Sequence, residues 1–205
     1  MFSYRVEPLY FQSQQEIIAA DFYYPKLLKM PAVIVMAHDL AAERSFGLAK
    51  FAKRFAQAGY AVVCFDYRGF GGSTGKPRGL VSIQQQLQDW ESVLIQLQKR
   101  RDINVRKMVL WGTSLSGGHV LTLAARQKSV QAVIAQIPYI DGQESLKLYP
   151  KKYLTKLSRI VAKDFMSKQL GLEAQTIPVI AESGIRCLAS ADSYRGYLSI
   201  VPQHI

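Results

Sequence analysis

The chain has little cysteine, since only Cys64 and Cys187 occur among its 205 residues. Two cysteines so far apart form neither a disulfide framework nor a CxxC pair, which argues against a disulfide-stabilised secreted domain and a cysteine-based metal site. No apolar run reaches the roughly 18 to 20 residues of a membrane span. The N-terminus lacks a basic segment followed by an apolar one. We therefore expect no secretory signal and a cytoplasmic protein.

Acidic residues are also scarce, and 26 lysines and arginines against 15 aspartates and glutamates leave a net charge of +11. Such a charge could bind nucleic acid through phosphate contacts. The basic residues are spread along the chain, however, apart from one cluster after residue 146. Helix-turn-helix, zinc-ligand and aromatic RNA-binding signatures are missing. We interpret the charge as a solvated basic surface and expect no nucleic-acid partner.

Apolar runs alternate with helical patterns along most of the chain. The strand-like runs cover residues 32–38, 60–67, 107–113 and 130–140, and the helical patterns between them cover residues 46–56, 83–97 and 117–126. The runs are continuously apolar, which is typical of parallel strands covered on both faces. This alternation predicts βαβ units and a doubly wound, mostly parallel α/β sheet.

The two ends of the chain add to this core. Two strand-like stretches within the first 25 residues predict a hairpin that flanks the sheet. Residues 148–170 carry an apolar and a basic stripe at helical spacing, which predicts a lid or surface helix, with a membrane-surface helix as the alternative. Farther on, only 177–183 and 196–202 look strand-like. We predict an α/β core in residues 1–142 and a helical lid-like segment with a tail in residues 143–205.

A turn rich in glycine and serine follows the third apolar run, in "VLWGTSLSGGHV". In open α/β sheets, ligands bind beyond the carboxyl ends of the strands. A serine in a tight turn at such an end, between small residues, presents its hydroxyl to the crevice. Ser114, with Gly112 and Ser116 two positions away on either side, is the best candidate nucleophile. Ser116 lies later in the turn, and a plain strand-to-helix turn capped by Ser114 is the alternative.

This turn and its surroundings resemble the α/β-hydrolase superfamily, in particular bacterial serine hydrolases with a "GTSxSGGHV" nucleophile elbow. The resemblance extends over about residues 30–145 and includes "VIVMAHDL", "FDYRGFGGSTG" and "VIAQIPYIDG" in the family's order. It implies hydrolysis of an ester or amide bond in a small molecule through an acyl intermediate on Ser114, without metal or cofactor. It also implies an oxyanion hole formed by the backbone N–H groups of Leu115 and Leu40.

One residue departs from the family pattern at this hole. The chain has Asp39 after His38, where the family usually has a glycine. Aspartate tolerates unusual backbone conformations better than most residues, so the turn itself can be kept. A carboxylate that points inward would, however, oppose the negative charge that develops on the substrate.

Residues 66–77, "DYRGFGGSTGKP", raise the alternative of a phosphate-binding loop. Phe70 and Pro77 break the GxxxxGK[ST] pattern, and Thr74 breaks the GxGxxG pattern. We therefore expect these glycines to shape the turn after the strand at 60–67 and predict no nucleotide cofactor.

A general base is difficult to identify among the three histidines. In the family the acid and then the histidine follow the nucleophile along the chain. His119 lies on the helix that begins at the nucleophile turn, and His38 precedes Ser114 and is expected to shape its loop. His204 remains as the base, although no predicted strand or helix holds it.

The acid is equally open. Asp141, directly after the strand at 130–140, is the preferred residue, and Asp192 is the alternative. The simplest interpretation is that the chain lacks the last two strands of a hydrolase, so a catalytically incomplete binding domain rivals the enzyme. A sheet that ends at 130–140 leaves an open parallel edge. A homodimer through that edge, or the helix at 148–170, would cover it.

Overall fold

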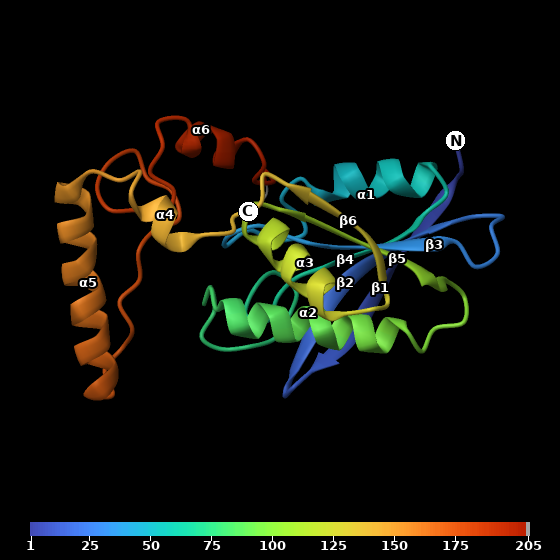
Figure 1. The fold of residues 1–205 in the computed structure, drawn as a ribbon, viewed down its shortest axis with the longest axis horizontal. Coiled ribbons are helices and arrows are strands. Elements are labelled where there is room, and N and C mark those ends of the chain that lie inside the picture. Colours follow the sequence, from blue (N-terminus) through green and yellow to red (C-terminus); the bar gives the residue numbers. More distant parts are fainter. Residues whose placement is uncertain (204–205) are drawn as a thin grey trace. The chain divides into compact units, whose positions relative to one another are not determined.

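The computed structural model describes residues 1–203. They divide into two compact units, Met1–Ile140 and Asp141–Gln203. The elements of the first unit are β1 (Tyr4–Ser13), β2 (Glu16–Pro25), β3 (Ala32–Ala37), α1 (Leu48–Gln57), β4 (Ala61–Phe65), α2 (Ile83–Leu97), β5 (Asn104–Thr113), α3 (Ser114–Arg126) and β6 (Val130–Gln136) (Figure 1). Those of the second unit are α4 (Gly142–Leu146), α5 (Lys151–Gln169) and α6 (Ser193–Leu198).

The first unit is built on one six-stranded sheet with the strand order β1-β2-β4-β3-β5-β6. Strands β4, β3, β5 and β6 are parallel, and the hairpin of β1 and β2 joins them antiparallel to β4. The predicted mostly parallel α/β sheet is confirmed, and the predicted N-terminal hairpin is also present.

The central strands are buried on both faces, as their continuous apolar sequences predict. Along β3, Val33 and Val35 pack with α2 and α3, whereas Ile34 and Met36 pack with α1. Successive side chains of a strand point to opposite faces, so one apolar run serves two cores. Figure 1 shows α1 on one side of the sheet and α2 and α3 on the other.

The predicted boundaries differ from the observed ones in two informative places. Helix α3 begins at Ser114, three residues before the predicted start, because the chain turns into the helix directly from β5. Strand β6 ends at Gln136 rather than at residue 140. Ile137 has a positive φ of 45°, and Pro138 cannot donate a ladder hydrogen bond, so the extended run stops there.

The second unit is helical in its described part, and the two strand-like pieces expected there are wrong. Residues 177–183 form neither helix nor strand, and residues 196–202 belong to α6 and the turn after it. A short apolar stretch becomes a strand only where a neighbouring strand is available for pairing. The helix expected at 148–170 is present as α5, which begins directly after Pro150. None of the helices in residues 1–203 has the length and apolar character that crossing a membrane requires.

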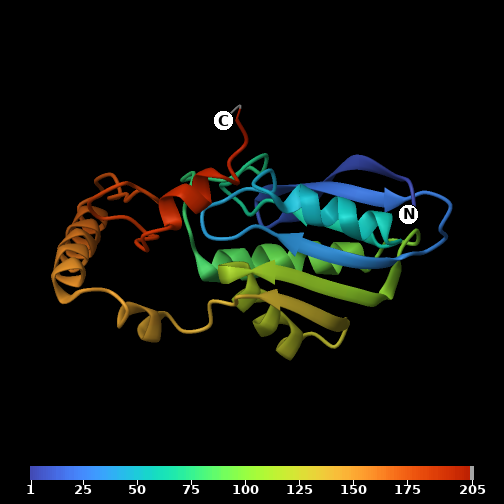
Figure 2. The same cartoon turned by 90° about the horizontal axis from the view of Figure 1, so that it is seen from above.

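Strand β6 forms one edge of the sheet within the described residues (Figure 2). Its neighbour on one side is β5, and Ile134 on β6 is 42% exposed. The chain beyond it exposes Ile137 and Ile140 by more than three quarters. An edge of this kind can pair with another chain. The homodimer through this edge therefore remains a prediction, which sedimentation velocity would test.

Candidate active site

The candidate site lies at the carboxyl ends of β3 and β5, where the order in which the chain adds strands to the sheet reverses. The helix that follows β3, α1, covers one face, and the helix that follows β5, α3, covers the opposite face. Strands β3 and β5 are direct neighbours, with Met36 aligned to Trp111. In open α/β sheets, two adjacent strands whose connections leave toward opposite faces create a crevice at their carboxyl ends. The loop that begins at His38 and the helix that begins at Ser114 therefore start at the same edge of the sheet.

Ser114 occupies a strained turn at that position. Its φ is +50°, a left-handed value that is uncommon for residues other than glycine. Two tight approaches show why small residues surround it. A Cβ atom on Gly112 would lie 2.3 Å from the carbonyl oxygen of Ser116, and one on Gly118 would lie 2.2 Å from that of Tyr139. The turn therefore excludes larger side chains at both positions, as a sharp strand-to-helix turn requires.

The alternatives to Ser114 fit the geometry less well. Ser116 is fully buried, and its Oγ accepts a hydrogen bond from the Tyr67 hydroxyl at 3.4 Å, which in turn accepts one from Trp90 Nε1 at 2.9 Å. Ser114 is only half-buried. Thr113, not Ser114, holds the N-cap position of α3, and no side chain caps the helix there. Of the two serines, Ser114 is the one that a substrate can reach.

Neither described histidine is arranged as a base for Ser114. His38 is buried; its Nδ1 donates to the carbonyl oxygen of Asp39 at 2.9 Å, and its Nε2 accepts from the N–H of Tyr67 at 3.2 Å. This pairing defines the neutral tautomer with hydrogen on Nδ1. Burial lowers the pKa of His38 to about 4. His38 thus joins the loops after β3 and β4, as expected for a loop-shaping residue.

His119 is hydrogen-bonded to α2. Its Nε2 lies 2.8 Å from Oε1 of Gln86. Burial lowers the pKa of His119 to about 4, so the ring is neutral near pH 7. That His119 is not the base stays a prediction from the family resemblance.

The carboxylate of Asp39 points into the turn at Ser114 and Leu115. Its Oδ1 accepts a hydrogen bond from the backbone N–H of Leu115 at 3.0 Å. The first N–H groups of a helix have no partner within the helix, and they lie at its positive end, so an anion is favoured there. In this structure the protein's own carboxylate takes the position that the family resemblance assigns to the substrate oxygen.

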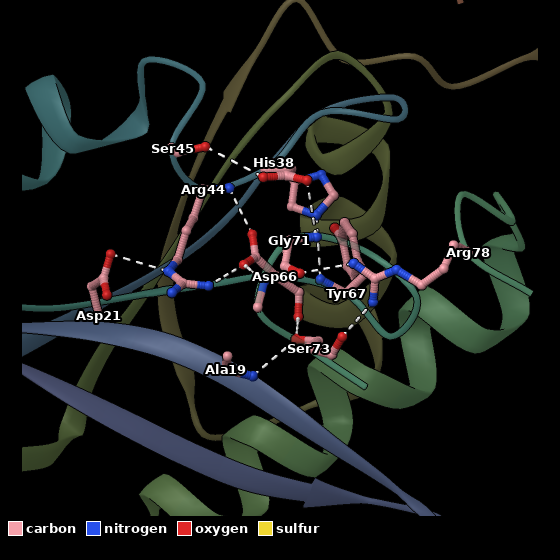
Figure 3. Close-up of polar contacts among 12 residues, drawn as sticks. Ala19, Asp21, His38, Arg44, Ser45, Asp66, Tyr67, Gly71, Ser73 and Arg78 are labelled. Carbon is pink, nitrogen blue, oxygen red and sulfur yellow. Dashed lines mark hydrogen bonds and ion pairs between the residues drawn. The ribbon is translucent and has the colours of Figure 1, made fainter. Parts of the chain in front are cut away.

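A buried ion pair supports the loop between β3 and α1, and the sequence analysis did not identify it. Arg44 bridges Asp66 and Asp21, and Figure 3 shows its guanidinium between the two carboxylates. Asp66 also accepts from the N–H groups of Arg44 and Gly72. Burial raises the pKa of the Asp66 carboxyl, against the opposite effect of Arg44. The available signal was a carboxylate directly after an apolar strand, where an unpaired charge would be costly.

The glycine-rich loop at 66–77 uses its N–H groups internally. Gly71 donates to Glu43 Oε1 at 3.2 Å, and Gly72 donates to Asp66 Oδ2 at 3.0 Å. Arg78 binds the carbonyl oxygens of Gly71 and Ser73, as Figure 3 shows for Ser73. A phosphate-binding loop instead directs such N–H groups at the ligand. These contacts support the interpretation of this segment as a structural turn.

The remaining predicted site residues are Leu40, Asp141, Asp192 and His204. Leu40 lies half-buried in the loop after β3. Asp141 belongs to the second unit and caps α4, where its Oδ1 accepts from the N–H groups of residues 143 and 144. Asp192 precedes α6 and is bound by the Ser190 hydroxyl. His204 lies outside the described residues. Within residues 1–203, no cluster of three or more histidine, cysteine, aspartate or glutamate side chains could hold a metal ion.

Comparison with known proteins agrees with this architecture. The chain is 40% identical over 194 residues to the quorum-quenching protein AidA of Acinetobacter baumannii, an alignment that covers 94% of this chain and 64% of that protein. It is 30% identical over 117 residues to the thiohydrolase AneE of Aspergillus aculeatus, covering 57% of this chain and 37% of that protein. The chain thus spans less than two thirds of the length of these relatives.

The solved structure of the α/β hydrolase GrgF from Penicillium has the same fold. It superposes with a TM-score of 0.74 at 23% identity, over 87% of this chain and 60% of that one. The family model of the serine aminopeptidases S33 matches residues 29–194, which include the loop after β3 and the turn at Ser114. The chain therefore belongs to the serine aminopeptidase S33 family of α/β hydrolases.

Proposed function

We propose that this protein hydrolyses ester or amide bonds of a small molecule through an acyl intermediate on Ser114. The observation that carries the proposal is the strained backbone of Ser114, φ +50°, at the carboxyl end of β5. Strain of this size costs on the order of 1 to 3 kcal/mol and persists where the surrounding structure holds it, often at functional sites. A plain helix start would not need it.

The proposed reaction begins when Ser114 Oγ attacks the carbonyl carbon of the substrate and loses its proton to a base. The carbonyl oxygen becomes negatively charged and is stabilised by the N–H groups of Leu115 and Leu40. The leaving group departs with that proton. Water then attacks the acyl-enzyme, which releases the carboxylic acid product and regenerates Ser114. His204 as the base and Asp141 as the acid, with Asp192 as its alternative, stay predictions from the sequence.

The named relatives support acyl chemistry in a broader sense. A thiohydrolase, by its name, acts on a sulfur ester, and other relatives named polyketide transferases match this chain at 25% to 28% identity. Thioesters and oxygen esters of one acid react through analogous tetrahedral intermediates and give the same acyl-enzyme, so both belong in the first substrate panel. We place activated esters ahead of amides, because their leaving groups need less help from an acid.

A specific observation favours a second candidate function, a binding domain without turnover. Within residues 1–203, both described histidines are engaged elsewhere, and the Asp39 carboxylate occupies the Leu115 N–H. Such a domain would keep the crevice and bind an acyl compound without reacting with it. Its affinity would not depend on the Ser114 hydroxyl.

Labelling of the full chain with a fluorophosphonate separates these two functions. We expect covalent attachment at Ser114, located by peptide mapping, and none in Ser114→Ala. Ser116→Ala is the matched control and should keep the label. Loss of labelling in His204→Ala would identify the base. A folded protein that takes up no label and turns over neither p-nitrophenyl esters nor thioesters would contradict the hydrolase proposal and favour the binding domain.

A further inference from the structure

Hydrogen bonds of the His38 ring fix the backbone on which the contact between Asp39 and Leu115 depends. His38 Nδ1 donates to the carbonyl oxygen of Asp39 at 2.9 Å, and the ring is anchored on its other side by the N–H of Tyr67. The backbone of Asp39 is therefore fixed to a buried ring, while its side chain extends to the N–H of Leu115 at 3.0 Å. This arrangement is part of the built loop and not a chance position of a free side chain.

The Leu115 N–H is the group that an anionic transition state on Ser114 would need. Ser114 is the preceding residue, so when its Oγ bonds to the carbonyl carbon of a substrate, the oxygen of that carbonyl falls next to this donor. A single N–H cannot fully serve two anionic oxygens, and the two negative charges would repel each other at such a distance. The substrate oxygen and the Asp39 carboxylate therefore compete for one position.

We propose that Asp39 is an internal plug of the oxyanion hole that restrains the reactivity of Ser114. This inference rests on the proposed acyl chemistry at Ser114. The carboxylate fills the hole in the free protein, and acyl transfer requires that it turn away from the Leu115 N–H. Asp39 is half-buried, so its side chain is partly exposed to solvent and is not enclosed by the core. Asp39 acts through the donor and is a positioning residue.

If Asp39 is such a plug, its replacement should raise the reactivity of Ser114, whereas most substitutions in an active site lower reactivity. Asp39→Asn removes the charge while keeping the size, and Asp39→Gly removes the side chain. Loss of one oxyanion donor lowers rates by about 100- to 1000-fold in other hydrolases. If the Leu115 N–H becomes available again as an oxyanion donor, the rate of fluorophosphonate attachment to Ser114 should rise. We expect an increase of roughly 100-fold in Asp39→Gly and of at least about 10-fold in Asp39→Asn.

Glu43→Gln is the matched control. Glu43 lies in the same loop and loses the same charge in this variant, but its Oε1 accepts from Gly71 rather than from Leu115. We expect it to label at the rate of the unmodified protein. Circular dichroism establishes that each variant is folded, and damage to the fold would lower the labelling rate and cannot mimic an increase.

A second measurement reports on the contact without any chemistry at Ser114. In protein labelled with ¹⁵N-leucine, the amide signal of Leu115 should shift in Asp39→Asn and stay in place in Glu43→Gln. Assignment of that signal comes from Leu115→Ile.

The outcomes separate this inference from the proposed function. Faster labelling in both Asp39 variants, with an unchanged Glu43→Gln, supports the plug. Equal or slower labelling in the Asp39 variants, with the wild type reactive, overturns the plug and leaves the acyl chemistry intact. No labelling in any folded variant overturns both.

Discussion

Gly112 lies directly against the carbonyl oxygen of Ser116, at a distance that leaves no space for a methyl group. A Cβ atom there would stand 2.3 Å from that oxygen and 2.5 Å from its carbon, both backbone atoms. Gly112→Ala should therefore lower the free energy of unfolding by about 3 kcal/mol, as overpacking of a rigid site does. Urea unfolding followed by tryptophan fluorescence measures this, since Trp90 and Trp111 both lie in the first unit.

Gly79→Ala serves as the comparison for that variant. Gly79 has a positive φ of 76° but no atom within 4 Å of its missing Cβ. We expect a loss of about 1 kcal/mol from the backbone conformation alone. Equal losses at Gly79 and Gly112 would contradict the close approach between Gly112 and the carbonyl group of Ser116.

Replacing Ser114 by glycine should abolish the proposed activity and should give a protein that is more stable than Ser114→Ala. Glycine adopts a φ of +50° without strain, whereas alanine does not. Ser114→Gly should therefore unfold at higher urea than Ser114→Ala, with a difference of about 1 kcal/mol, and neither variant should take up the fluorophosphonate. Indistinguishable stabilities would mean that the turn holds no strain.

Acid should destabilise the first unit before most carboxylates titrate. Burial lowers the pKa of His38 and of His119 from 6.5 to about 4. Because the pKa in the folded state is below that in the unfolded state, the stabilisation is complete above pH 6.5 and is lost as the pH falls toward 4. Protonation of each histidine on unfolding should lower the free energy of unfolding by about 2 kcal/mol between pH 7.5 and pH 5.

The quantity to compare among variants is the difference between the free energies of unfolding at pH 7.5 and at pH 5. His38→Gln lowers stability at both pH values, but it should reduce the difference by about 2 kcal/mol, because one titrating group is lost. A difference that stays the same in His38→Gln would show that His38 accepts a proton in the folded protein.

The ion pair of Arg44 and Asp66 should be important for stability. Asp66 is 1% exposed, so Asp66→Asn leaves the Arg44 guanidinium without its buried partner. We expect a loss of about 3 kcal/mol in the free energy of unfolding. Asp102→Asn removes the carboxylate that pairs with Arg100 at 40% exposure and should cost less than about 1 kcal/mol. A small effect of Asp66→Asn would mean that Asp21 alone satisfies Arg44.

The sequence by itself determined the sheet and the position of the tight turn at Ser114. Continuous apolar runs separated by helical spacing leave few alternatives to a parallel sheet with two covered faces, because each strand must bury both of its sides. The small residues around Ser114 predict a tight turn for a similarly local reason. Both inferences depend on neighbours in sequence, which is why they could be made without coordinates.

Tertiary structure decided how the loops meet. Asp39 and Leu115 are 76 positions apart, and only the pairing of β3 with β5 brings the carboxylate to the N–H group. The sequence showed that Asp39 replaces a glycine but not where its side chain points, because that direction depends on His38 and Tyr67. The strand-like pieces after residue 176 failed for the same reason. Pairing is a property of two segments in space, and the pattern of one segment cannot reveal it.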